Sequence, residues 1–279
     1  MSPTSGGTGV NDEQSPQGRY ASVEGTRTYY ETSGPADGPP VVLVHTAGAD
    51  GRQWRHLAPQ LAEAGYRAIA VDLPGHGKSY PVDWEPRTTI HQYARFVHAV
   101  TDVLGLDRPI VGGCSIGGAI ALDIAVNYAD EVSCVVSMAA TGRTRGAPLG
   151  RLEHPHACPG WQDILEYSVV DATAEATSPA CRTELRWQHR GSQRVATNDL
   201  QAWADHDVSA SLPDATCPVL LLRGEADYFI QDDYYERTVA GLPECEAHVL
   251  ADVGHYPMME APDRVSELMI AFLREHHKR

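Results

Sequence analysis

Short apolar runs alternate with segments of helical periodicity along most of this chain, and this alternation constrains the fold more than any other feature. Helical patterns at residues 57–64 and 90–104 are examples of the segments between the runs. Such an alternation favours an α/β fold in which helices cover both faces of a mostly parallel sheet. An antiparallel ribbon at residues 20–30 is predicted to precede it. The β-type runs are residues 41–44, 68–71, 109–111, 132–138, 218–222 and 247–250.

The alternation is interrupted once, after the sixth predicted strand. Residues 141–212 contain helical fragments and turn residues but no clear strand. This stretch is too long for an ordinary connection between two strands and predicts an inserted helical cap. The predicted organisation is a disordered tail at 1–18, a core formed by 19–140 and 214–279, and a cap at 141–213.

Charge and composition exclude several classes of partner. The 279 residues carry a formal net charge of −15, which repels phosphate backbones and anionic lipids. We therefore expect a small-molecule substrate, no nucleic acid and no membrane, with a homodimer left open. The polar N-terminus lacks the pattern of an export signal, and the six cysteines show no paired spacing, so a cytoplasmic protein with free thiols is predicted.

No metal or other cofactor is expected. His154, His156 and Cys158 are spaced like metal ligands, but Pro155 and Pro159 make this stretch a kinked loop. A structural zinc site needs four ligands, and the sequence offers no evident fourth one here.

A serine flanked by glycines lies where a predicted strand meets a predicted helix. Gly113 and Gly117 stand two residues to either side of Ser115, between the apolar run 109–111 and the small-residue helix at 119–126. Glycines at these positions let strand and helix approach closely, while the tight turn exposes the hydroxyl. Ser115 is therefore a candidate nucleophile.

A serine nucleophile needs a base and an orienting carboxylate within reach. Among thirteen histidines, His255 lies in the loop between the last predicted strand and the last helix, from which a base can reach the top of the sheet. Asp227 follows the strand at 218–222 and is the preferred acid, with Glu225 as a near competitor. The predicted catalytic residues are Ser115, Asp227 and His255.

The chain order of these three residues, on alternating strands and helices, resembles that of the α/β-hydrolase superfamily. The run from Asp72 to Ser79 is similar to a turn that such proteins carry after their fourth strand. His45-Thr46-Ala47-Gly48 falls where they carry an oxyanion loop, although Thr46 replaces the usual second glycine. The resemblance implies a cofactor-free hydrolase.

Two backbone N–H groups are expected to stabilise the oxyanion of the reaction. Ile116 follows the nucleophile and should supply one of them. The resemblance implies Ala47 as the other, with Thr46 as an alternative donor. His45 and His76 are predicted to hydrogen-bond the loops around the site rather than to react.

A serine in place of an aspartate implies an acyl-enzyme intermediate, and hence a substrate with an activated carbonyl. The loop at 45–50, followed by Trp54, is similar to that of 3-oxoadipate enol-lactonases. Hydrolases of meta-cleavage products resemble the chain as well, but they carry tryptophan after the catalytic histidine where this chain has Tyr256. A small ester or lactone is therefore the predicted substrate, and C–C hydrolysis of a vinylogous diketo acid is the alternative. A ligand receptor on the same fold is a third class, which the three catalytic-type residues disfavour.

The predicted cap supplies candidate substrate contacts. Trp161, Tyr167, Trp187 and Trp203 offer aromatic surface, and Arg182, Arg186 and Arg190 recur every four residues on one helical face. An arginine of this row is a candidate ligand for a substrate carboxylate. The predicted substrate-binding residues are Thr46, Trp161, Arg186, Trp187, Arg190 and Tyr256.

Overall fold

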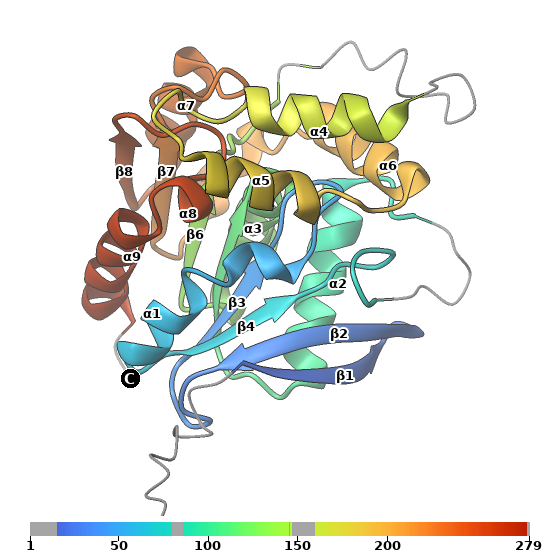
Figure 1. The fold of residues 1–279 in the computed structure, drawn as a ribbon. Coiled ribbons are helices and arrows are strands. Elements are labelled where there is room, and N and C mark those ends of the chain that lie inside the picture. Colours follow the sequence, from blue (N-terminus) through green and yellow to red (C-terminus); the bar gives the residue numbers. More distant parts are fainter. Residues whose placement is uncertain (1–15, 80–85, 145, 147–159, 278–279) are drawn as a thin grey trace, which may run out of the picture.

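An eight-stranded sheet forms the centre of the molecule in the computed structural model, which describes residues 16–79, 86–144, 146 and 160–277 (Figure 1). The strand order is β1-β2-β4-β3-β5-β6-β7-β8, with β1, β2 and β4 paired antiparallel and the other neighbours parallel. The predicted α/β-hydrolase fold class is confirmed. The strands are β1 (Gln17–Val23), β2 (Thr26–Ser33), β3 (Pro40–Val44), β4 (Arg67–Val71), β5 (Ile110–Cys114), β6 (Cys134–Met138), β7 (Val219–Gly224) and β8 (Cys245–Leu250).

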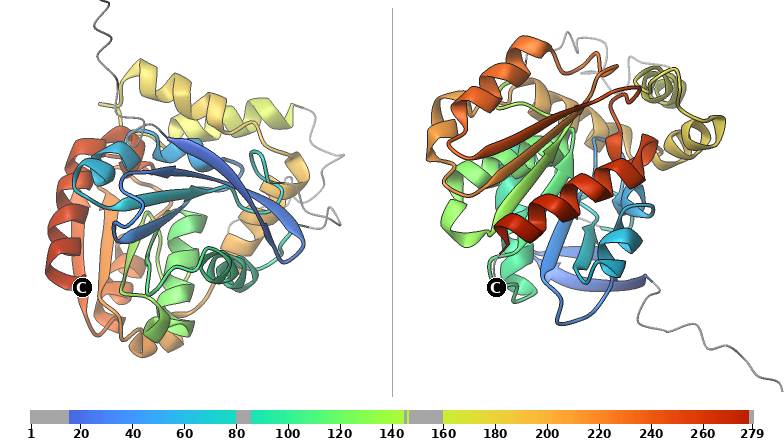
Figure 2. Two further views of the ribbon diagram at one scale, coloured as in Figure 1. Left: turned by 90° about the horizontal axis from the view of Figure 1, so that it is seen from below. Right: turned by 90° about the vertical axis from the view of Figure 1, so that its left-hand side faces the viewer.

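Helices cover both faces of the sheet, as Figure 2 shows. On one face lie α1 (Ala58–Glu63) and α9 (Pro262–His276), and on the other lie α2 (Ile90–Val103), α3 (Ile116–Asn127) and α7 (Asp232–Gly241). Strands β5 and β6 are buried at every position, because helices shield them from both sides. The short helices of the core are η1 (Gly51–Trp54), η2 (Ala129–Glu131) and α8 (Pro257–Glu260). Among the described residues, no helix is long and apolar enough to cross a membrane.

The helical insertion after the sixth strand is also confirmed. Helices α4 (Trp161–Asp171), α5 (Pro179–Gln188) and α6 (Gln193–Ala204) and the turn η3 (Ser209–Asp214) lie between β6 and β7 in the chain. In Figure 1, α4 and α5 lie above the upper end of the sheet, where the parallel strands end. The loops that follow those strands therefore meet the insertion, which we call the cap.

The predicted tail at 1–18 extends too far into the chain. Gln17 and Gly18 belong to β1, where they pair with Thr32 and Glu31 of β2. Residues 1–15 of this predicted tail, together with His154, His156 and Cys158, lie outside the described residues.

Helix α3 packs so closely against the sheet that backbone meets backbone, with no room for a side chain between them. A Cβ atom added to Gly117 would lie 2.2 Å from the carbonyl oxygen of Val44, and one added to Gly113 would lie 2.2 Å from that of Gly117. Any larger side chain at these two positions would push the helix away from β3 and β5. This contact fixes where the loop between β5 and α3 projects.

Replacing Gly117 by alanine therefore tests the close packing of α3. In a helix this exchange is ordinarily favourable, but here the clash with the Val44 carbonyl should lower the free energy of unfolding by about 3 kcal/mol or more. Gly105→Ala is the control, because its added Cβ meets no atom within 4 Å and only its φ of +62° is strained. Its expected cost is about 1–2 kcal/mol, and equal losses in urea denaturation would contradict the packing argument.

Candidate active site

Ser115 occupies a strained turn between β5 and α3. Its φ of 57° and ψ of −118° are unusual for a residue with a side chain. Hydrogen bonds on both sides hold this conformation, since Ser115 N–H donates to Met138 O at 2.9 Å and Ala119 N–H donates to Ser115 O at 2.9 Å. The side chain is 8% exposed and lines a cavity below the cap. The turn therefore presents the hydroxyl to a partly enclosed space.

His255 and Asp227 meet at the same end of the sheet. Asp227 follows β7 and His255 follows β8, and His255 Nδ1 lies 2.8 Å from Asp227 Oδ2 in a buried pair. An ionised carboxylate only accepts hydrogen bonds, so Nδ1 carries the proton. Phe229 N–H donates to the other carboxylate oxygen at 3.0 Å and fixes the plane of the acid. His255 also lines the cavity of Ser115, whereas the competing acid Glu225 is exposed.

Glu260 holds the loop of His255 from both sides. Its carboxylate accepts hydrogen bonds from Gly254 N–H at 3.0 Å and from Tyr256 N–H at 2.9 Å. It also accepts from Ala174 N–H at 2.8 Å and from the hydroxyl of Thr177 at 2.5 Å, both in the segment between α4 and α5. One side chain thus joins the histidine loop to the cap.

No motif in the sequence predicted Glu260 as a site residue. The signal available was its position five residues after His255, in the one-turn helix α8, from which a carboxylate can fold back on the preceding loop. A second contact strengthens the same junction, because His255 N–H donates to Ala172 O at 2.8 Å.

The two predicted oxyanion donors lie on opposite sides of Ser115 in the chain. Ile116 is the first residue of α3, and the first N–H groups of a helix have no acceptor inside it. Ala47 lines the cavity in the loop after β3, next to Thr46, whose N–H donates to Gln53 Oε1 at 2.9 Å. That bond occupies the Thr46 amide, which was the alternative donor.

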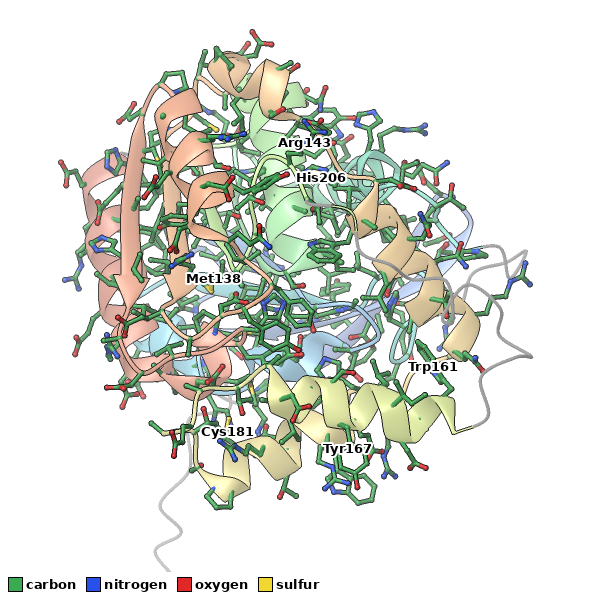
Figure 3. The ribbon with its side chains drawn as sticks, turned by 90° about the horizontal axis from the view of Figure 1, so that it is seen from above. Met138, Arg143, Trp161, Tyr167, Cys181 and His206 are labelled. Carbon is green, nitrogen blue, oxygen red and sulfur yellow. The ribbon has the colours of Figure 1, made fainter. Side chains whose placement is uncertain are left out.

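The cavity is mainly apolar and has a volume of about 170 Å³. Three of the predicted substrate-binding residues line it, namely Thr46, Trp161 and Tyr256. Trp203 lines it too, but Tyr167 is 67% exposed and lies on the outer side of α4 in Figure 3. The other apolar lining residues are Ala47, Ile164, Leu165, Val169, Leu200 and Phe229.

The structure does not bring Arg186, Trp187 or Arg190 to this cavity. Arg186 and Arg190 form ion pairs of 3.2 and 2.9 Å with the Glu166 carboxylate on α4. Trp187 is 58% exposed, and the guanidinium of Arg190 lies 3.9 Å from its ring centre. The four-residue spacing predicted Arg186 and Arg190 on one helical face, but α5 ends at Gln188 and Arg190 lies beyond the helix.

His189 is a cavity residue that the sequence analysis missed. It follows α5, and its Nδ1–H donates to Leu185 O at 2.7 Å, so Nε2 accepts from the Thr46 hydroxyl at 3.1 Å. Burial lowers the pKa of His189 to about 4, which keeps the ring neutral at neutral pH. Among thirteen histidines, no local pattern singled it out.

Metal ligands do not cluster near this site. Within the described part of the chain, no three histidine, cysteine, aspartate or glutamate side chains come together as a metal site. The groups that the structure gathers around Ser115 are a neutral imidazole, an imidazole–carboxylate pair and an apolar wall.

Comparisons with known proteins place this chain in a family. A family model described as "Alpha/beta hydrolase family" matches residues 41–268. A 2-hydroxy-6-oxononadienedioate/2-hydroxy-6-oxononatrienedioate hydrolase from a Pseudomonas species is 28% identical over 250 residues, covering 84% of this chain and 87% of its own length.

Two solved structures share the fold. The enol-lactonase of Burkholderia xenovorans LB400 has a TM-score of 0.83 at 22% identity, over 92% of this chain and 100% of its own. A thermophilic esterase of Thermogutta terrifontis has a TM-score of 0.82 at 24% identity, over 94% of this chain and 100% of its own.

Replacing Glu260 by alanine tests its role in holding the histidine loop. The change leaves four hydrogen-bond donors without their acceptor, so the free energy of unfolding should fall by about 2–3 kcal/mol. Glu267→Ala on the exposed face of α9 is the matched control and should change it by less than about 0.5 kcal/mol. Equal midpoints for both variants in urea denaturation would show that Glu260 does not hold the loop.

Proposed function

Because the chain belongs to the alpha/beta hydrolase family, we propose that this serine hydrolase cleaves a small, uncharged carboxylic ester or lactone through an acyl-enzyme intermediate. The observation that carries the proposal is the meeting of Ser115 with the His255–Asp227 pair at one largely apolar cavity. Serine as the nucleophile calls for a carbonyl substrate, since its product is an acyl ester of the enzyme.

Each group has a defined task in the first half of the reaction. Ser115 Oγ attacks the substrate carbonyl while His255 Nε2 takes its proton, and Asp227 stabilises the imidazolium through Nδ1–H. The carbonyl oxygen becomes an oxyanion that accepts hydrogen bonds from the N–H groups of Ala47 and Ile116. When the carbonyl re-forms, the bond to the leaving oxygen breaks and His255 returns the proton to it.

Water completes the cycle through the same groups. His255 Nε2 takes a proton from water, whose oxygen attacks the acyl carbonyl and regenerates the oxyanion. Collapse of this intermediate breaks the ester bond to Ser115, and His255 returns the proton to Oγ. The products are a carboxylic acid and an alcohol, or a hydroxy acid where the substrate is a lactone.

The cavity wall favours an uncharged acyl group. Among the residues that the structure describes, its lining contains no lysine or arginine, and Arg186 and Arg190 are engaged by Glu166 on the outer side. A carboxylate moved from water to such a wall loses its hydration without gaining a partner. The dienedioate named for the Pseudomonas relative carries two carboxylates, so C–C hydrolysis of such an acid is the less favoured candidate.

Ser115→Ala tests the nucleophile. Turnover of 4-nitrophenyl butyrate should fall by about a thousandfold or more, because the acyl ester forms on Ser115 Oγ. The melting temperature should stay near that of the wild type. A fluorophosphonate probe should label the wild type and Ser168→Ala, which removes another cavity serine, but not Ser115→Ala. Labelling that persists without Ser115 would refute the assignment.

Two esters whose six-carbon acyl chains end in a methyl group or in a carboxylate test the acyl group. The kcat/KM for 4-nitrophenyl hexanoate should exceed that for mono(4-nitrophenyl) adipate by about 100-fold, since the second buries a carboxylate. The methyl ester of the adipate removes the charge at the cost of one added methyl group and should recover most of the rate. A preference for the charged ester would instead favour the acidic substrates of the relatives.

A further inference from the structure

Two cap residues form hydrogen bonds with the loop that carries Ala47, one on each side of Ala47 in the chain. This oxyanion loop comprises residues 45–48. On one side, Thr46 Oγ1 donates to His189 Nε2 at 3.1 Å, and on the other, Gly48 N–H donates to Asp199 Oδ2 at 3.0 Å. His189 follows α5 and Asp199 lies on α6, so both anchors come from the cap.

Asp199 is a fully buried carboxylate that joins three segments of the core. Its side chain has 0% exposure. Beside Gly48 N–H, it accepts from His76 Nε2 at 2.7 Å in the loop after β4 and from the hydroxyl of Tyr93 on α2 at 2.5 Å. Burying an isolated carboxylate costs free energy of folding, and the hydrogen bonds from these three donors offset that cost.

The negative charge of Asp199 is balanced by a positive charge on His76. Both ring nitrogens of His76 face acceptors, Asp199 Oδ2 at 2.7 Å and Pro74 O at 3.1 Å, so the ring carries both protons. Burial alone would lower the pKa of His76, but the Asp199 carboxylate outweighs it and the net pKa is raised. Asp199 and His76 thus form a buried ion pair between cap and core.

The neighbouring His45 is neutral and shapes the start of the same loop. Its Nδ1–H donates to Thr46 O at 2.8 Å, and its Nε2 accepts from Leu73 N–H at 3.1 Å. Burial, together with the His76 charge 4.8 Å away between ring centres, lowers the pKa of His45 to about 3. At neutral pH the His45 ring therefore carries one proton, on Nδ1.

The cap backbone also packs directly on the loop. A Cβ added to Gly191, between α5 and α6, would lie 2.9 Å from Gly48 O, and one added to Gly48 would lie 3.0 Å from the Cβ of Ala196. Contact at this distance leaves the loop little room to shift relative to α6.

We propose that the cap sets the position of the Ala47 N–H, with Asp199 as the main positioning residue and His189 as the second anchor. The inference rests on the proposed function, in which that N–H holds the oxyanion. It gives the cap a task in the chemical step, beyond covering the substrate. Loss of an anchor should weaken the stabilisation of the tetrahedral intermediate more than the binding of the ester.

The test compares Asp199→Ala, Asp199→Asn and Thr46→Val with the control Thr197→Val. Thr197 lies on the same helix as Asp199 and is buried, and its hydroxyl has no hydrogen-bond partner among the described residues, so its loss should change little. The number of active sites is measured by fluorophosphonate labelling taken to completion, and kcat is expressed per titrated site. This removes any effect of a smaller folded fraction.

Asp199→Ala should lower kcat per titrated site about 10- to 100-fold while KM changes less than about threefold. The affinity for an alkyl trifluoromethyl ketone, which forms an oxyanion adduct with serine, should fall by the same factor. The affinity for the corresponding alcohol, which forms none, should stay constant. Asp199→Asn keeps an acceptor for Gly48 but removes the charge of the ion pair, so an intermediate loss is expected.

A merely structural role of Asp199 predicts a different result. Variants with a lowered melting temperature but unchanged kcat per titrated site and unchanged ketone affinity would overturn the proposal. If Asp199→Ala does not fold, kcat per titrated site and ketone affinity are compared for Asp199→Asn and Thr46→Val instead. A wild type that a fluorophosphonate does not label at Ser115 would instead refute the proposed function.

Discussion

The contact between α3 and the sheet is the constraint from which the rest of the site follows. Gly117 places the helix against the carbonyl oxygens of Val44 and His45, at the end of β3 and the start of the oxyanion loop. The same approach forces the chain through the positive φ of Ser115. One packing contact therefore sets the proposed nucleophile Ser115, the first N–H of α3 and the loop of Ala47 relative to one another. Strain in the turn is stabilised by the burial of a whole helix on the sheet.

Two carboxylates connect this framework to the cap. Glu260 joins the His255 loop to the segment between α4 and α5, and Asp199 joins the oxyanion loop to α6. A carboxylate suits this task because it accepts several hydrogen bonds and donates none, so one side chain can gather N–H groups from distant segments. The loops of the proposed base His255 and of the predicted oxyanion donor Ala47 are thus both attached to the cap.

The sequence predicted the groups that lie at strand ends and failed for those whose role depends on contacts between distant segments. Ser115, Asp227 and His255 each follow a β-type run, and parallel strands all end at one edge of the sheet, so their meeting follows from topology. Asp199 and His189 belong to an irregular insertion, where no periodicity says which core segment a side chain meets. The spacing of Arg186 and Arg190 predicted that the two side chains lie close together. It did not predict that they point away from the cavity, because both faces of an amphipathic cap helix can carry polar residues. The tail was predicted too long because Gln17 and Gly18 read as polar coil, although pairing with β2 holds them as a strand.

The cap contributes to the site in two ways that use different residues. Its α4 lines the cavity with Trp161, Leu165 and Val169, whereas α6 both lines the cavity and carries the anchor Asp199. Side chains of the first kind can change size or shape without disturbing the ion pair, because Asp199 contacts Gly48, His76 and Tyr93 rather than α4. Because α4 lines the cavity without contacting Asp199, its side chains can change while the proposed oxyanion donors keep their place. By this argument, differences in substrate among related chains of the same fold are more readily produced on α4 than on α6.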